Sequence, residues 1–416
     1  MIWTDLAPPR LQVRSVEIDD PGPLLARLPR TEAHAWIRHG EGMVGYGEVV
    51  RHKPSSIAEA DEWWSDLITH TEIVTDLDHA PAGSGLVAFG SFVFDPESSE
   101  GQSCLIVPEV VIGRRNGRCW LTQIGPESPV WPVTTPIPPA VPPRAVRYTT
   151  GGLSEAAWQD AVTDAVRRIV RGDLDKVVLA RDLVANAEND IDLRWVAGRL
   201  AERYPQCWTY LVDGLVGATP EMLVKREAGL ASSRVLAGTI RRSGHDDHDL
   251  NLAAALTRSS KDLEEHEYAV RSVAAALSPF CSEMDVPESP YVLVLPNLLH
   301  LATDVSGAAH ADVSALALAA ALHPTAAVCG TPTDPARSLI AELEHLDRER
   351  YAGPVGWVDA HGDGEWGIAL RCGLISETDP RQIRLFAGCG IVAGSDPAAE
   401  LAESVAKLIP MREALG

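Results

Sequence analysis

The sequence predicts an α+β protein whose core is large antiparallel β-sheet. Residues 1 to about 130 alternate turns marked by Gly and Pro with short strand-like runs such as HAWIRHG and GLVAFGSFVFD. Near the C-terminus, GEWGIALRCGLI and RQIRLFAGCGIV are joined by a polar turn, so we expect these two strands to pair as a hairpin. Helical patterns occur between such strands without the regular strand–helix–strand alternation of a parallel sheet, which favours the α+β class.

Three stretches of the chain differ in composition. Residues 1–130 are β-rich and are expected to be the N-terminal part of the same fold as the rest. Residues 131–150 are expected to form a linker or surface excursion, because WPVTTPIPPAVPPRA contains six prolines and can be neither helix nor central strand. Residues 151–416 hold the longer helices and strands; the family resemblance described below implies that they form the catalytic region.

The elements after the linker follow from caps and periodicity. Ser154 is a suitable N-cap, apolar residues recur at helical spacing over residues 158–169, and Gly172 suits the end of that helix. The final helix is expected to have Asp396 as N-cap and Pro397 as its first residue. Between these helices we expect, in order, the strands DLDKVVLARDL and QCWTYLVDG, a helix at about 261–276, the strand YVLVLP, an alanine-rich helix before His323, and a helix from Pro335 to about Glu349.

Composition argues against several classes of function. The formal charge of −22 on 416 residues disfavours a nucleic-acid or anionic-membrane partner, because such partners bind basic surfaces. The seven cysteines are odd in number and lack CxxC spacing, which argues against a disulfide framework and a structural zinc site. No apolar run is long enough to span a bilayer, and the N-terminal MIWTDLAPPR has no signal pattern, so we expect a cytoplasmic protein.

Lys176 lies in the strand DLDKVVLARDL, where alternation places it on the same face as Val178 and Ala180. Desolvating an ammonium group beside small apolar residues is costly unless the charge has a partner. Lys176 is therefore either the solvated first residue of a strand or an amine held inside a site. The strand pattern alone leaves both interpretations open.

Two predicted helices carry acidic residues on one face. In SSKDLEEHEYAV, Asp262 and Glu265 are three positions apart, and in SDPAAELAESVAKL, Glu400, Glu403 and Lys407 also share a face. Either set alone is typical of a solvated helix surface. If the two helices face each other, their carboxylates provide the hard oxygen ligands that Mg²⁺ prefers.

Further residues could contribute to a site. Glu221, in a predicted turn within GLVGATPEMLVKR, could be a general acid with a raised pKa or an ordinary turn carboxylate. Arg371 interrupts an apolar strand and could bind a carboxylate or form a structural salt bridge. Gly388 and Gly390 could let a ligand approach the backbone closely, or they could mark a bend in a strand. His323 could be a histidine at a helix end whose ring nitrogens are hydrogen-bonded within the protein.

Nine stretches, taken in order, resemble the chorismate-utilising enzymes, a family that includes isochorismate, salicylate, anthranilate and aminodeoxychorismate synthases. These stretches are KVVLAR, GATPEML, LAGTIRR, SKDLEEHEYAV, HLATDVSG, LHPTAAV, GWVDAHGDGEWGIALRC, RLFAGCGIV and ELAESVAKL. They cover residues from about 153 to 414. The N-terminal part matches more loosely, chiefly through FGSFVFDP.

The resemblance implies one α/β/β/α orthogonal sandwich, with helices on the outside and the active site between the sheets. It implies Mg²⁺ held by Glu265 and Glu403, with Asp262 and Glu400 acting directly or through water. The metal would hold the ring carboxylate of the implied substrate, chorismate, and Arg371 would hold its enolpyruvyl carboxylate. The implied substrate-binding residues are Ala237, Gly238, Thr239, His323, Arg371, Gly388, Gly390 and Lys407.

Two positions distinguish members of the family. In the resembling enzymes that add water, a lysine at the position of Lys176 acts as general base, whereas anthranilate synthase differs there. Aminodeoxychorismate synthase has a nucleophilic lysine where this chain has Ala237. The resemblance therefore implies an isochorismate synthase. Lys176, kept neutral by burial, would deprotonate a water that attacks C2, and Glu221 would protonate the departing C4 hydroxyl.

The alternative is a salicylate synthase, which forms isochorismate and then eliminates pyruvate; anthranilate and aminodeoxychorismate synthases fit less well. Ala326, Cys329 and Cys389 replace residues usual in the family, which leaves the shape of the substrate pocket open. We expect chorismate as the partner, no glutaminase subunit and a monomer. The resemblance is compatible with a product that serves menaquinone, siderophore or other secondary metabolism.

Overall fold

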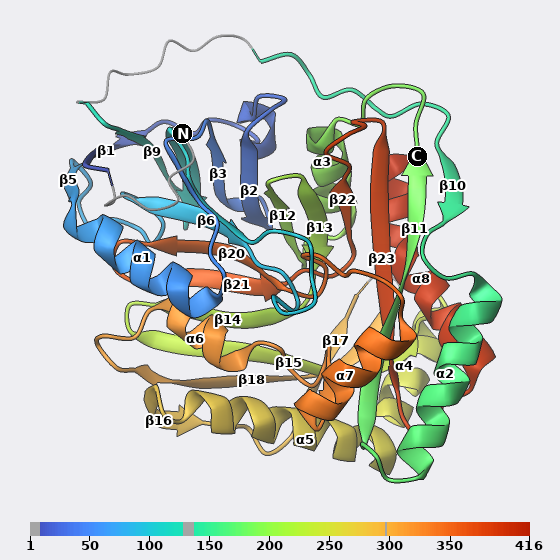
Figure 1. Ribbon diagram of the computed structural model, residues 1–416. Helices are drawn as coiled ribbons and strands as arrows, with labels where there is room; N and C mark the ends of the chain where they lie inside the picture. The colour runs from blue at the N-terminus through green and yellow to red at the C-terminus, as the bar shows by residue number, and fades with distance from the viewer. Residues whose placement is uncertain (1–8, 128–136, 296–297) are drawn as a thin grey trace.

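The computed structural model describes residues 9–127, 137–295 and 298–416. Two large sheets pack face to face, and their strands run in crossing directions (Figure 1). Neighbouring strands pair antiparallel except β1 with β5. The α+β orthogonal sandwich expected from the sequence is confirmed.

The larger sheet has 13 strands and combines residues from both ends of the chain. In spatial order it contains β10 (Arg147–Thr150), β11 (Lys176–Asn186), β23 (Gln382–Ile391), β22 (Cys372–Ile375), β13 (Leu215–Thr219), β12 (Trp208–Val212), β2 (Ala33–Arg38), β3 (Glu41–Tyr46), β8 (Val110–Arg115), β9 (Arg118–Gly125), β1 (Leu11–Ile18) and β5 (Thr71–Thr75), with β19 (Gly330–Thr331) paired to β11.

The smaller sheet has 10 strands and likewise joins N-terminal to C-terminal segments. Its order is β16 (Cys281–Asp285), β18 (Leu298–Ala309), β15 (Leu230–Arg241), β14 (Met222–Glu227), β21 (Gly364–Ile368), β20 (Pro354–Asp359), β6 (Val87–Ser91), β7 (Cys104–Val107) and β4 (Val50–His52), with β17 (Tyr291–Val294) paired to β18. The N-terminal strands β6, β7 and β4 thus continue a sheet whose other strands come from beyond residue 220.

Helices cover the outer faces of both sheets (Figure 1). Those against the larger sheet are α2 (Glu155–Val170), α3 (Leu193–Arg203) and α8 (Pro397–Leu415), and those against the smaller sheet are α1 (Ile57–Thr69), α5 (Ser260–Leu277) and α6 (Ala315–Leu322). In addition, α7 (Thr333–Leu343) contacts β11 of the larger sheet and α4 (Asp246–Leu256) contacts β15 of the smaller sheet, and a 3₁₀ helix, η1, spans Leu24–Arg27. Among the described residues, no helix is both long enough and apolar enough to cross a membrane.

Caps determine where the predicted helices begin. The Ser154 hydroxyl accepts a hydrogen bond from the Ala157 amide, and the Asp396 carboxylate accepts two at the start of α8, as predicted. The predicted end of one helix was wrong, because α7 ends at Leu343, before the predicted Glu349. The N-terminal part, predicted as β-rich, also contains α1.

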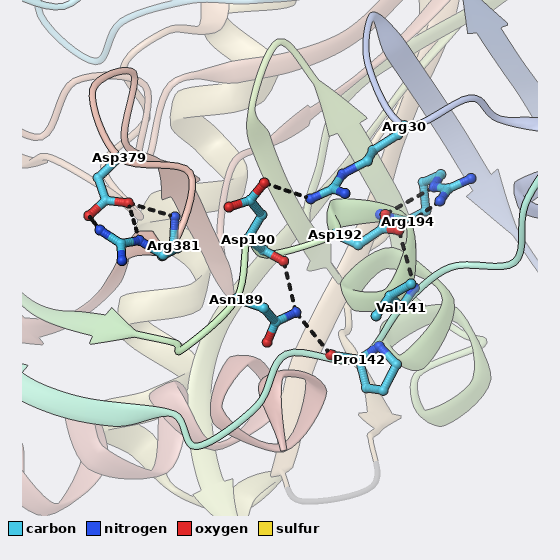
Figure 2. Close-up of polar contacts among 9 residues, drawn as sticks. All are labelled: Arg30, Val141, Pro142, Asn189, Asp190, Asp192, Arg194, Asp379 and Arg381. Atoms are coloured by element: carbon cyan, nitrogen blue, oxygen red, sulfur yellow. Dashed lines mark hydrogen bonds and ion pairs between the residues drawn. The ribbon is translucent and has the colours of Figure 1, made fainter.

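The described end of the proline-rich segment, residues 137–146, forms neither helix nor strand and is fastened to the chain around β11 and α3. The Val141 amide donates to the Asp192 carboxylate at 3.2 Å, and the Asn189 side chain donates to the Pro142 carbonyl at 3.3 Å (Figure 2). Asp192 in turn pairs with Arg194 at 2.7 Å and caps α3. The predicted residues 131–136 lie outside the described part of the chain.

The run GEWGIALRCGLI, predicted as one strand, is two strands in different sheets. β21 ends at Ile368 in the smaller sheet, and β22 begins at Cys372 in the larger sheet. β22 does pair antiparallel with β23, so the predicted hairpin exists only in its second half. Residues 369–371 form a corner between the sheets, and the candidate site lies at this corner.

Candidate active site

A cavity of about 260 Å³ lies where the two sheets meet. Most of the residues singled out from the sequence line it together. They are Lys176, Glu221, Ala237, Gly238, Thr239, Arg371, Gly388, Gly390, Glu400, Glu403 and Lys407. These residues come from β11, β15, β23, α8 and the two segments that pass from one sheet to the other.

The two segments that change sheets run side by side and carry Glu221 and Arg371. One joins β13 to β14, and the other joins β21 to β22. The Ala218 amide donates to the Arg371 carbonyl at 3.3 Å, and the Ile368 amide donates to the Glu221 carbonyl at 3.1 Å. Arg371 lies outside the strands, at φ +49°, a conformation that non-glycine residues rarely adopt and that is enriched at functional sites. Its predicted position within a strand was therefore wrong.

Glu221 is buried at the wall of the cavity, 8% exposed. Burial raises its pKa to about 7, although Arg371, Lys176 and Lys407 act in the opposite direction. The Glu221 amide donates a hydrogen bond to the Thr219 hydroxyl at 3.2 Å, which fixes the backbone at the corner. Glu221 can therefore hold a proton near neutral pH, as a general acid requires.

Lys176 is the first residue of β11, and its side chain lies along Gly390 of β23. A Cβ atom at position 390 would lie 3.0 Å from Lys176 Cε and 3.5 Å from Nζ, so a residue larger than glycine would press on the amine. Val178, which follows on the same face, also lines the cavity. The structure therefore places Lys176, which is half-buried, at the wall of the cavity, and its predicted role as general base stays a prediction.

The acidic residues of α8 form a cluster beside β23. Ligand atoms of Glu400, Glu403 and Cys389 lie within 4.8 Å of one another. The Lys407 amine pairs with Glu403 at 2.6 Å and donates to the Gly388 carbonyl at 2.8 Å, which ties the helix to the strand. Burial opposes ionisation of Glu403, but Lys407 outweighs it, so the pKa of Glu403 is lower than usual.

This donor set fits Mg²⁺. Burial raises the pKa of the Cys389 thiol to about 12, and the thiol hydrogen-bonds the Glu400 carbonyl at 3.3 Å. The two carboxylates thus remain as hard oxygen ligands, the kind that Mg²⁺ binds. Asp262 and Glu265 lie on α5, but their side chains are outside the described part of the structure. The predicted roles of these four carboxylates as ligands stay predictions.

A bulge in β15 shapes the wall opposite α8. The pairing of β15 with β18 shifts by one residue between Ala237 and Thr239, at Gly238 with φ +80°. The Thr239 hydroxyl is hydrogen-bonded to His300 Nδ1 at 2.9 Å. No lysine side chain comes from position 237, because that residue is alanine.

His300 and Tyr351 line the cavity but were not selected from the sequence. Burial lowers the pKa of His300 to about 3, and its Nε2 has no hydrogen-bond partner among the described residues. The Tyr351 hydroxyl is close to Gly388, 2.9 Å from where a Cβ would lie. The place of His300 in the strand motif HLATDVSG was the signal that could have identified it.

His323 is placed in a neighbouring cavity, and it does not line the main one. Its Nε2 is hydrogen-bonded to the Phe94 carbonyl at 2.9 Å. Its predicted contact with the substrate stays a prediction. All seven cysteines are buried and free, in keeping with the absence of a disulfide framework expected from their spacing.

Known proteins resemble this chain over most of its length. Residues 138–416 match the family described as chorismate binding enzyme. Isochorismate synthase DhbC of Bacillus subtilis (strain 168) is 41% identical over 62% of this chain and 67% of its own length. Isochorismate synthase EntC of Escherichia coli (strain K12) is 38% identical over 63% of this chain and 68% of its own length.

A solved structure supports the fold. MenF, the menaquinone-specific isochorismate synthase from Escherichia coli, superimposes with a TM-score of 0.80 at 24% identity, over 99% of this chain and 96% of MenF. At this identity the likeness concerns the fold alone. The family match over two thirds of the sequence is independent of it, and the chain therefore belongs to the family of chorismate-binding enzymes.

Proposed function

We propose that the protein is an isochorismate synthase that converts chorismate to isochorismate by adding water at C2 and removing the C4 hydroxyl. One observation carries this proposal: an amine, Lys176, and a buried carboxyl group, Glu221, line the same cavity, and no nucleophilic side chain is present at Ala237. The relatives named above are isochorismate synthases, which supports the same reaction.

Lys176 is proposed as the general base. In its uncharged form the amine takes a proton from a water molecule as the water oxygen forms its bond to C2. The amine needs a fixed position for this step, and contact with Gly390 restricts where the side chain can lie. Bond formation at C2 shifts the ring double bonds towards C4.

Glu221 is proposed as the general acid. As the double bonds shift, the C4 hydroxyl leaves, and Glu221 gives it a proton so that water departs instead of hydroxide. A pKa of about 7 keeps a substantial fraction of Glu221 protonated at neutral pH. After one turnover Lys176 has gained a proton and Glu221 has lost one, so the two groups must be reset.

The dianionic substrate needs cationic contacts in this acidic protein. Arg371 is proposed to bind the enolpyruvyl carboxylate through its planar fork, and Lys407 with the backbone around Gly388–Gly390 to contact the ring carboxylate. Glu400 and Glu403, with Asp262 and Glu265, would hold Mg²⁺. When bound, Mg²⁺ would neutralise and orient that carboxylate.

Product analysis tests the proposal. The purified chain is incubated with chorismate and Mg²⁺, without ammonia or a glutaminase, and the products are separated by chromatography. We expect isochorismate at equilibrium with chorismate and no pyruvate in an assay coupled to lactate dehydrogenase. Stoichiometric pyruvate with salicylate would support the salicylate synthase instead, and no conversion of chorismate would refute the proposed function.

A further inference from the structure

A second cavity of about 350 Å³ adjoins the main one. Glu221 and Ala327 line both cavities, so Glu221 stands at the boundary between them. The second cavity, here called the rear chamber, extends between α5, α7 and the smaller sheet. Its polar lining includes Ser272, His323, Thr325 and Arg337.

Three buried polar atoms of the rear chamber have no hydrogen-bond partner among the described residues. They are His323 Nδ1, Thr325 Oγ1 and Arg337 Nε. Leaving a buried polar group without a partner costs about 1–3 kcal/mol, so such groups are normally satisfied by protein or by ordered water. All three atoms belong to residues that line the rear chamber, which points to a polar occupant of this cavity.

The chemistry of these atoms identifies the occupant as water. Burial lowers the pKa of His323 to about 4, so the ring is neutral at pH 7. Its Nε2 must donate the hydrogen bond to the Phe94 carbonyl, which leaves Nδ1 as an acceptor. Arg337 Nε can only donate. An anion would satisfy Arg337 but would face the lone pair of His323, whereas water can donate to one and accept from the other.

The charges around Glu221 are compatible with a carboxyl group that exchanges a proton with water in the rear chamber. On the main-cavity side the charged or titratable groups are Lys176, His300, Tyr351, Arg371, Glu400, Glu403 and Lys407. On the rear side they are Arg234, His323 and Arg337. Arg234 is occupied by Asp304 through two hydrogen bonds at 2.7 and 3.0 Å. Glu221 is thus the one carboxyl group lining the rear chamber among the described residues.

We propose that water in the rear chamber is the route by which Glu221 regains its proton between turnovers. This inference rests on the proposed function, which leaves Glu221 ionised and Lys176 protonated after each reaction. Water in the chamber donates a proton to Glu221, and the proton is replaced from solvent, which also accepts the proton that Lys176 releases. One proton thus moves from Lys176 to Glu221, and no other bond changes. Thr325 and Arg337 act as positioning residues that hold the water.

Kinetics of two chamber variants test this role. Thr325→Val keeps the side-chain shape without the hydroxyl, and Arg337→Leu removes the donor. Thr163→Val, on helix α2 and in the lining of neither cavity, is the matched control. We expect kcat to fall about tenfold in both chamber variants with KM unchanged, less than the roughly 10²- to 10⁴-fold cost of losing a general acid. Added imidazole buffer should restore kcat, because a small acid replaces the missing proton donor. Wild-type kcat in both variants, or a loss that buffer does not restore, would overturn the role.

A crystal structure tests the chamber without using activity. We expect ordered waters bonded to His323 Nδ1 and Arg337 Nε in the wild-type protein, and fewer of them in Thr325→Val. A dry chamber, or an anion bound to Arg337, would overturn the inference. If the wild-type chain fails to convert chorismate, the proposed function fails, while the water positions still decide what the chamber contains.

Discussion

The buried carboxyl group of Glu221 should make the protein less stable as pH rises, and Glu221→Gln should remove this effect. The pKa of Glu221 is about 7 in the folded protein, against an ordinary value of 4.5. The folded state therefore binds this proton more tightly than the unfolded chain does. The stabilisation is fully present below about pH 4.5 and is lost as pH rises through about 7.

The size of the effect follows from the same two values. One pKa unit corresponds to about 1.4 kcal/mol, so the free energy of unfolding should fall by about 3 kcal/mol, most of it between about pH 5 and pH 8. Glutamine has nearly the same shape and cannot ionise, so Glu221→Gln should not show this loss. The same variant cannot donate a proton, and its kcat should fall by about 10²- to 10⁴-fold.

Urea unfolding at several pH values measures this prediction. At each pH, the free energy of unfolding of Glu221→Gln is subtracted from that of the wild type. The pH dependence of this difference is the quantity that the prediction concerns. Other buried acids, such as Asp359, whose pKa burial raises to about 6, affect both proteins equally and cancel. Glu288→Gln, at an exposed position, is the control and should behave like the wild type. Parallel curves for the wild type and Glu221→Gln would refute the reasoning, because Glu221 would then be ionised or solvated in the folded protein.

Four further predictions concern the cavity. Lys176→Ala should lower kcat by about 10²- to 10⁴-fold, with unchanged circular dichroism, and full activity would exclude Lys176 as the base. Arg371→Lys loses the planar fork and should raise KM for chorismate by about 10- to 100-fold in steady-state assays. Gly390→Ala should lower kcat by about 10- to 100-fold by pressing on Lys176, whereas Gly198→Ala, where a Cβ meets no atom within 4 Å, should not. A chelator should abolish conversion and added Mg²⁺ restore it, while Glu403→Gln should weaken Mg²⁺ binding measured by calorimetry.

The parts of the structure that depend on neighbouring residues could be predicted from the sequence. Ser154 and Asp396 begin their helices as expected, because a cap acts over three residues. The spacing of Glu400, Glu403 and Lys407 placed them on one helix face, and they lie together in the structure. Helix periodicity and capping are local, so no knowledge of the tertiary fold was needed.

The parts that depend on which sheet a strand joins could not be predicted in this way. An apolar run predicts a strand, but it does not reveal that residues 369–371 leave one sheet for another. Arg371 was therefore expected on a strand face, although it lies at a corner with a positive φ. His300 was missed for a related reason, since its position in the cavity depends on the bulge at Gly238 in a different strand.

The corner explains why the candidate catalytic groups come from distant parts of the sequence. A flat sheet presents side chains of neighbouring strands at fixed spacing on one face, so an acid and a base on opposite sides of a ring are hard to obtain from one sheet. At the corner, Glu221 leaves the larger sheet for the smaller one, while Lys176 remains in β11 of the larger sheet. Both side chains can then face one small volume from different directions. The same turn away from the sheet buries Glu221, and burial is the main cause of its raised pKa, so the geometry that positions the acid also keeps it protonated.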